Sequence, residues 1–186
     1  MRPVQRDSLL DYVSYETERD KLRAAVMAIK APRRLHVGGV LTFLFENTAT
    51  IRYQIQEMMR AERVVREADI RHELDTYNEL LGAPGELGCT LLIEIDDAEE
   101  RQRRLAQWIE LPAALYARLP NGALVRPVVD DRQVGESRLS SVLYLKFPVR
   151  GQVPWAIGSD LPGLSAETEL PAASRAALAE DLASDL

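Results

Sequence analysis

Apolar residues recur at helical spacing through the first part of the chain. Leu22, Val26 and Ile29 lie three or four positions apart, which predicts a helix over residues 15–30. Ser14 stands directly before this segment and is a residue type that caps helix N-termini.

Two more helices are expected after an apolar run that extends from residue 40 to residue 45. Asn47 or Thr48 is placed to cap a helix over about residues 48–65, and a third helix should cover about residues 69–81. The apolar stripe of the second helix would consist of Ile51, Ile55, Met58 and Val65.

The pattern then changes from helical spacing to alternation, which is typical of strands. Residues 86–96 place Cys89, Leu91, Ile93 and Ile95 on one side of a strand. Further elements are expected as follows: a charged helix over 99–109, a hairpin of 114–119 and 123–129 around Asn121-Gly122, strands over 139–149 and 155–158, and a helix over 172–183 after Pro171.

This order of elements predicts an α+β fold: N-terminal helices followed by a mainly antiparallel sheet, with the helices packed on one side. No linker divides residues 1–186, so we expect a single domain. Residues 158–169 have the character of a loop, and Leu178 with Leu182 makes only a narrow stripe. We therefore expect residues 159–186 to form a loosely packed C-terminal extension.

Composition narrows the function classes. The 186 residues are 46% hydrophobic and 28% charged, as in a globular protein, and the net charge of −6 disfavours nucleic-acid and membrane-surface binding. One cysteine excludes an internal disulfide and a thiolate cluster within the chain. The first residues lack the apolar segment of a secretory signal, so a cytoplasmic location is the expectation.

The second expected helix is unusually rich in polar groups beside its apolar stripe. On a helical wheel Glu62 falls within the stripe, whereas Asn47, Thr50, Gln54 and Glu57 line the adjacent edge. A carboxylate in such a stripe must find a partner. This helix is therefore the best candidate for a site.

Three interpretations of this helix remain open. In the first, Gln54, Glu57 and Glu62 form a buried network with backbone groups and with arginines such as Arg33, Arg34 or Arg104. In the second, a ligand or metal pocket forms where four carboxylates converge, and in the third the helix is a partner-docking surface. The four carboxylates are Glu46, Glu57, Glu62 and Glu94.

Smaller signals add little chemistry. His36 follows Arg33 and Arg34 before a glycine turn, and the two arginines are candidates for anion binding. Only two histidines occur, too few for a carboxylate-bridged di-iron site, and no catalytic triad or metal site is assigned. Trp108 ends an amphipathic helix that either packs in the core or serves a partner such as a second subunit of a homodimer.

Several spaced motifs resemble an uncharacterised bacterial family, domain of unknown function thirty-five-oh-one. The resemblance covers about residues 7–150. Its motifs here are Arg33-Arg34-Leu35-His36-Val37-Gly38, Leu41-Thr42-Phe43-Leu44-Phe45-Glu46-Asn47, Thr50, Gln54-Ile55-Gln56-Glu57-Met58, Glu62, Glu73-Leu74, Tyr77-Asn78, Glu86-Leu87, Thr90-Leu91, Ile93-Glu94, Arg101, Arg103-Arg104-Leu105 and Ser141-Val142.

The resemblance implies a setting rather than an activity. In bacterial genomes, the genes of this family look like neighbours of genes for rubrerythrin-like and iron–sulfur proteins. This arrangement implies a role in oxidative stress or electron transfer. The first hypothesis is thus a non-enzymatic accessory protein with a rubrerythrin-like or iron–sulfur partner and no cofactor of its own. The alternative is a small-molecule-binding protein or enzyme with a carboxylate-lined pocket near Glu46, Glu57 and Glu94.

Overall fold

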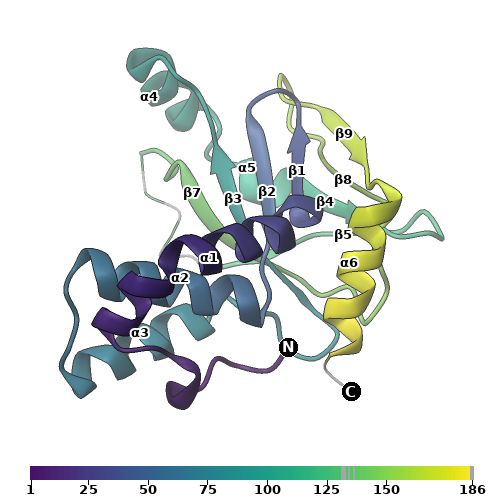
Figure 1. Cartoon of the computed structure of the whole chain (residues 1–186). Helices are drawn as coiled ribbons and strands as arrows, with labels where there is room; N and C mark the ends of the chain where they lie inside the picture. Colours follow the sequence, from purple (N-terminus) through teal and green to yellow (C-terminus); the bar gives the residue numbers. More distant parts are fainter. Residues whose placement is uncertain (131–132, 134, 136, 185–186) are drawn as a thin grey trace.

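The structure, a computed structural model, describes residues 1–130, 133, 135 and 137–184 (Figure 1). Helices dominate the first part of the chain and antiparallel strands the rest, which confirms the α+β class. Figure 1 shows α1, α2 and α3 grouped on one side of the strands, with α6 apart from them.

The N-terminal helices form one layer. Asp11, rather than Ser14, caps the first long helix, because its carboxylate accepts hydrogen bonds from the backbone N–H groups of Val13 and Ser14. The elements are η1 (Arg6–Ser8), α1 (Tyr12–Lys30), η2 (Ala31–Arg33), α2 (Thr48–Ala61) and α3 (Glu67–Asn78).

Helix α2 begins where the sequence predicts and ends earlier. Asn47 is its cap and forms a capping box with Thr50, in which each side chain accepts from the other residue's backbone N–H. The helix stops at Ala61, and Arg63 adopts a left-handed conformation with φ of 53°. The stripe that the sequence extends to Glu62 and Val65 is therefore interrupted, and Val65 is 70% exposed.

Five strands form sheet A. All its neighbours pair antiparallel, in the order β1-β2-β3-β7-β6. Phe43 lies opposite Leu91, which lies opposite Leu143, so these three apolar side chains share the inner face. The bounds are β1 (Arg34–Val37), β2 (Leu41–Phe45), β3 (Leu87–Ile93), β6 (Val128–Val129) and β7 (Val142–Phe147).

A second sheet, sheet B, was not expected from the sequence. The predicted hairpin around Asn121-Gly122 is confirmed, since β4 and β5 pair across it. Pro127 then breaks the ladder, because it has no backbone N–H, and the chain crosses to sheet A as β6. Sheet B has the order β5-β4-β8-β9, with β4 (Leu115–Arg118), β5 (Leu124–Val125), β8 (Ala156–Ser159) and β9 (Ala166–Glu169).

The C-terminal segment is packed more closely than the sequence suggests. Residues 166–169 form an edge strand of sheet B, and Leu178 and Leu182 of α6 (Ala172–Ala183) enter the core between the sheets. The expectation of a loosely packed extension over 159–186 is therefore wrong for its described residues. Ala-Glu-Thr-Glu has too few apolar positions to indicate a strand, and the partner of the leucine pair lies far away in sequence.

The two sheets enclose the main core. Phe43, Leu91 and Leu143 of sheet A share it with Leu115 and Ile157 of sheet B, and all five are at most 1% exposed. Full burial of such side chains stabilises the fold by roughly 1.5–3 kcal/mol each. A second core holds the helical layer together and contains Val4, Leu9, Ile51, Ile55, Met59, Ile70, Leu74 and Leu81.

Two further helices, α4 (Ala98–Gln107) and α5 (Leu111–Ala114), lie between β3 and β4 in the chain. Trp108 follows α4 and Leu111 begins α5, and both side chains belong to the main core. They therefore do not form the partner-docking face that was one of the two alternatives for this segment. Within the described part of the chain, no helix combines the length and the apolar character needed to cross a lipid bilayer.

Candidate functional site

The outer face of sheet A, opposite the main core, differs from the inner face. Strand alternation places Leu44, Thr90 and Tyr144 directly opposite one another on it, with Leu92 and Val142 as the next pair. Side chains of the helical layer lie against part of this face and leave a cavity of about 220 Å³. This inner cavity is lined by Lys30, Leu44, Glu46, Ile51, Gln54, Tyr77, Leu80, Thr90, Leu92, Val142 and Tyr144.

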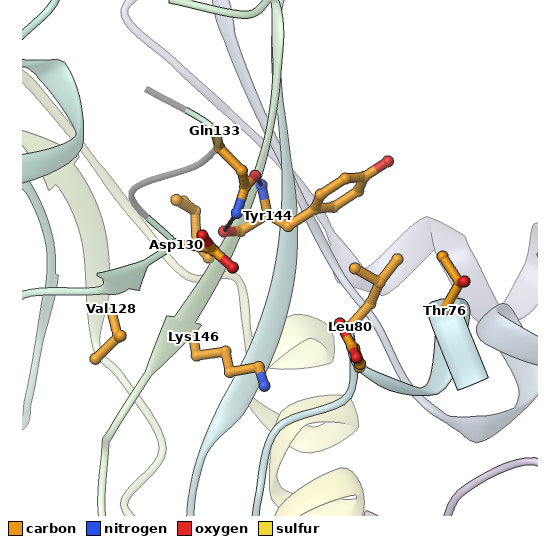
Figure 2. Close-up of a pocket in the computed structure, with 9 residues that line it drawn as sticks. Thr76, Leu80, Val128, Asp130, Gln133, Tyr144 and Lys146 are labelled. Carbon is orange, nitrogen blue, oxygen red and sulfur yellow. Dashed lines mark hydrogen bonds between the residues drawn. The ribbon is translucent and has the colours of Figure 1, made fainter. Parts of the chain in front are cut away.

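A larger cavity of about 450 Å³ adjoins the first one (Figure 2). The two cavities share Leu80 and Tyr144, so they meet at these side chains. We call the two together the groove. The outer cavity is lined by Thr76, Glu79, Leu80, Val128, Asp130, Gln133, Tyr144, Leu145 and Lys146.

Tyr144 is held at the backbone while its ring remains available to the groove. The Gln133 amide donates to Tyr144 O at 3.1 Å and accepts from Tyr144 N at 2.6 Å, as another strand would. Figure 2 shows this pairing and shows the Tyr144 ring extending away from it toward the side where Leu80 and Thr76 lie. The ring thus stands at the junction of the two cavities.

Glu46 is the buried acid of the inner cavity. It follows β2 directly, its backbone N–H donates to Gly88 O at 2.9 Å, and the residue is 8% exposed. Thr90 Oγ1 donates to Glu46 Oε1 at 2.8 Å, and Thr50 Oγ1 contacts Oε2 at 2.5 Å. No lysine, arginine or histidine nitrogen among the described residues forms an ion pair with it.

Glu57 is satisfied in a different way. Tyr15 Oη donates to it at 2.7 Å, and Arg19 donates through two nitrogens at 2.8 Å each. The hydrogen bond from Arg19, more than any other contact, holds the pKa of Glu57 below its usual range. Burial raises the pKa of Tyr15. Glu57 therefore belongs to a network within the helical layer, and its arginine partner is Arg19 rather than Arg33, Arg34 or Arg104.

Glu94 lies at the opposite end of sheet A from Glu46. Glu46 pairs with Gly88, whereas the backbone N–H of Glu94 donates to Val40 O, six residues further along the strand. That spacing corresponds to about 20 Å. Glu94 accepts a hydrogen bond from Thr42 Oγ1 at 2.5 Å. The expected convergence of Glu46, Glu57 and Glu94 in one pocket is therefore wrong.

Glu62 does not share the cavity of Glu46 either, and instead lines a separate surface hollow with Asp69 and Glu73. It is the C-cap residue of α2 and is exposed, because the helix ends before the stripe reaches it. Its place in the apolar stripe was thus wrongly predicted. Gln54 does line the inner cavity, where a hydrogen bond with Tyr77 opposes the rise in the Tyr77 pKa that burial causes.

Arg33 and Arg34 do not form a joint anion site. Arg33 is buried and donates to both oxygens of Asp181, at 2.7 and 2.9 Å, and to the carbonyls of Ile29 and Ala177. Arg34 is the first residue of β1 and is exposed. Asn47, besides capping α2, donates from its amide to Asp181 at 3.0 Å.

Some structural residues escaped the sequence analysis. Gln56, which the helical wheel turns away from the core, is 5% exposed and pairs with both backbone groups of Leu10. Its burial follows from the N-terminal segment, which packs beside α2 and has no local signal. Tyr77 was named only within a family motif, and Tyr144 only fell within the strand expected over 139–149. Their presence in one groove depends on the packing of α3 over the strand pair β3 and β7.

Neither metal ligation nor thiol chemistry is indicated at these residues. Among the described residues, no three histidine, cysteine or acidic side chains gather closely enough to hold a metal ion. Cys89 is 2% exposed on the inner face of sheet A, as predicted for a core thiol, and burial raises its pKa well above the usual range.

Comparisons with known proteins identify the family to which this chain belongs. The sequence matches the family described as "Protein of unknown function (DUF3501)" over residues 3–182. A solved structure, a "novel protein of unknown function" from Burkholderia pseudomallei K96243, is similar with a TM-score of 0.89 and 30% identity over 97% of this chain and 100% of that one. No curated protein matches the chain. The chain therefore belongs to the DUF3501 family of proteins of unknown function.

Proposed function

We propose that this protein binds a small organic molecule in the groove on the outer face of sheet A. The supporting observation is the pair of adjoining cavities that meet at Leu80 and Tyr144. Together their volumes fall within the range of about 300–1,000 Å³ that ligand pockets usually have.

The composition of the walls supports a ligand of mixed character. Leu44, Leu92 and Val142 offer apolar contacts, and the tyrosine rings add flat surface. Glu46 and Gln54 place polar atoms at the inner end, and Lys146 lines the outer cavity. Apolar walls with a few fixed polar groups are the arrangement that orients a bound molecule.

This proposal revises the carboxylate-pocket hypothesis. Of its three acids only Glu46 lines the groove, because Glu57 is bound by Arg19 and Glu94 lies at the far end of the sheet. An acid and a base from this set therefore do not face each other, and the proposal is one of binding and assigns no reaction.

The accessory role beside a rubrerythrin-like or iron–sulfur protein stays a prediction from the family resemblance. Its partner would be a protein, whereas the cavities described above fit a small molecule. The two roles are not exclusive, since an accessory protein can respond to a metabolite.

A fragment screen by two-dimensional amide NMR tests the proposal. We expect fragments to shift the resonances of Leu80, Thr90 and Tyr144, and the Leu92→Trp variant to abolish these shifts because indole fills the inner cavity. Leu124→Trp, at a 47% exposed position of sheet B, is the matched control and should preserve them. Fragments that leave the groove unperturbed, or bind equally to Leu92→Trp, would contradict the proposal.

A further inference from the structure

Glu46 has a buried negative charge with an incomplete set of partners. A carboxylate can accept about four hydrogen bonds, and the described residues supply one to each oxygen, from Thr90 and Thr50. The Thr50 hydroxyl has one proton and also lies 3.0 Å from Asn47 O, so the contact with Glu46 is shared. The acid therefore retains acceptor capacity.

Burial of a carboxylate without a cation is costly in a protein interior, because the charge loses its solvation by water. Part of this cost is offset by the N-terminus of α2, since Glu46 directly precedes the cap residue Asn47. A cation in the cavity would reduce the remaining cost.

The cavity contains one lysine, and that lysine is directed elsewhere. Lys30 lines the inner cavity, but its ammonium lies 5.5 Å from the centroid of the Tyr53 ring, which is a cation–π distance. No ion pair joins it to Glu46 in the described chain. Among the described residues, no cationic side chain therefore neutralises the Glu46 carboxylate.

The surroundings of that position match an ammonium group with an apolar body. Tyr77 and Tyr144 present aromatic rings, which attract cations, and Gln54 offers an amide in the same cavity. Leu92 and Val142, the next pair along the strands after Thr90 and Tyr144, would contact the apolar part of the molecule. An anionic ligand in the inner cavity would instead meet repulsion from Glu46.

We propose that the ligand of the groove is a small organic amine, whose ammonium group donates to Glu46 while its apolar part lies between Leu92 and Tyr144. This inference rests on the proposed function and names its ligand class. Glu46 is then the residue that determines specificity.

A competing explanation assigns Glu46 a structural role alone, as an anchor between the end of β2 and the start of α2. That explanation predicts a loss of stability in a Glu46 variant without any change in the preference among ligands. The preference, rather than the stability, is therefore the quantity to measure.

The test uses benzylamine and benzyl alcohol, two probes of nearly equal shape, in amide NMR titrations of the full chain. For the wild-type protein we expect benzylamine to bind at least about tenfold more tightly, which corresponds to about 1.4 kcal/mol. In Glu46→Gln we expect this preference to vanish, because the ammonium group loses its counter-charge. Leu124→Trp, on sheet B and away from the groove, is the control and should keep the preference.

The outcomes separate this inference from the broader one. Equal binding of the two probes to the wild-type protein, or a preference that survives in Glu46→Gln, overturns the amine assignment while binding in the groove stands. Absence of any probe or fragment from the groove overturns both. If Glu46→Gln does not fold, the wild-type comparison alone still decides, together with shifts of the Thr50 and Thr90 resonances, which must accompany benzylamine binding.

Discussion

Two carboxylates near the start of α2 are buried to a similar degree and satisfied in different ways. Asp181 is 6% exposed and receives two hydrogen bonds from Arg33 and one from Asn47. Glu46, the residue before Asn47, is 8% exposed, and among the described residues its carboxylate has only threonine hydroxyls as partners. One acid is closed by a cation, and the other is left open toward a cavity.

The difference teaches which acid can serve a ligand. Asp181 joins α6 to η2 through a bidentate ion pair with Arg33. A ligand could bind Asp181 only by breaking this ion pair. A ligand could reach Glu46 without breaking an ion pair, because Glu46 lines a cavity and no residue in the described part of the chain is its counter-ion. Burial alone therefore does not identify a binding residue, whereas burial, cavity and missing counter-charge together do.

The largest loss of stability is expected when Asp181 loses its arginine partner. Arg33→Met leaves Asp181 buried and unpaired, so we expect a loss of about 3–5 kcal/mol in the free energy of unfolding, measured by urea denaturation. The double variant Arg33→Met/Asp181→Leu should recover most of this loss. If Arg33→Met lost less stability than the double variant, Arg33 and Asp181 would not form the buried ion pair described above.

Neutralisation of the open acid should cost less. Glu46→Gln keeps the shape and one oxygen acceptor, and the threonine hydroxyls can rotate to accept from the new amide, so we expect a loss of about 1–2 kcal/mol. The same urea series measures it. A loss as large as that of Arg33→Met would mean that Glu46 has a structural role equal to that of Asp181.

A smaller effect is expected where an acid has partners to spare. Tyr15→Phe removes one hydrogen bond from Glu57 while Arg19 keeps two, so we expect a loss of about 0.5–1.5 kcal/mol. Tyr53→Phe, in the same helical layer but without a hydrogen bond to Glu57 among the described contacts, is the control. Both variants are measured in the same urea denaturation series. A loss of stability of the same size in both would refute a specific role for the Tyr15 hydroxyl.

The smallest effect is expected in the acid range. The Arg19 hydrogen bond depresses the pKa of Glu57 in the folded state, so the unfolded chain binds the proton more readily. The stability from Glu57 is thus complete above its unfolded pKa and is lost as the pH falls through the lower folded one. In Glu57→Gln the decline of stability below about pH 4.5 should be shallower. An unchanged slope would contradict the assignment.

Local signals in the sequence were enough for part of this structure. The cap at Asn47, the inward side of β3 with Cys89, Leu91 and Ile93, and the hairpin at Asn121-Gly122 all depend on neighbours a few residues apart. Each was read from residue type and spacing, and each is confirmed.

The remaining features depend on contacts between distant residues. Arg33 finds its partner 148 positions away, and nothing near it in the sequence points to Asp181. The early end of α2 moved Glu62 into solvent, and the antiparallel register separated Glu94 from Glu46. Sequence could place Glu46 between a strand and a helix, but its missing counter-ion became visible only once the helices were packed on the sheet.

A crystal structure of the protein grown with benzylamine tests the central claim most directly. We predict density for the ring beside Leu92 and Tyr144, with the ammonium nitrogen about 2.7–3.2 Å from an oxygen of Glu46. Benzylamine bound elsewhere while the inner cavity contains only water, or bound in the groove with its nitrogen turned away from Glu46, would contradict the account.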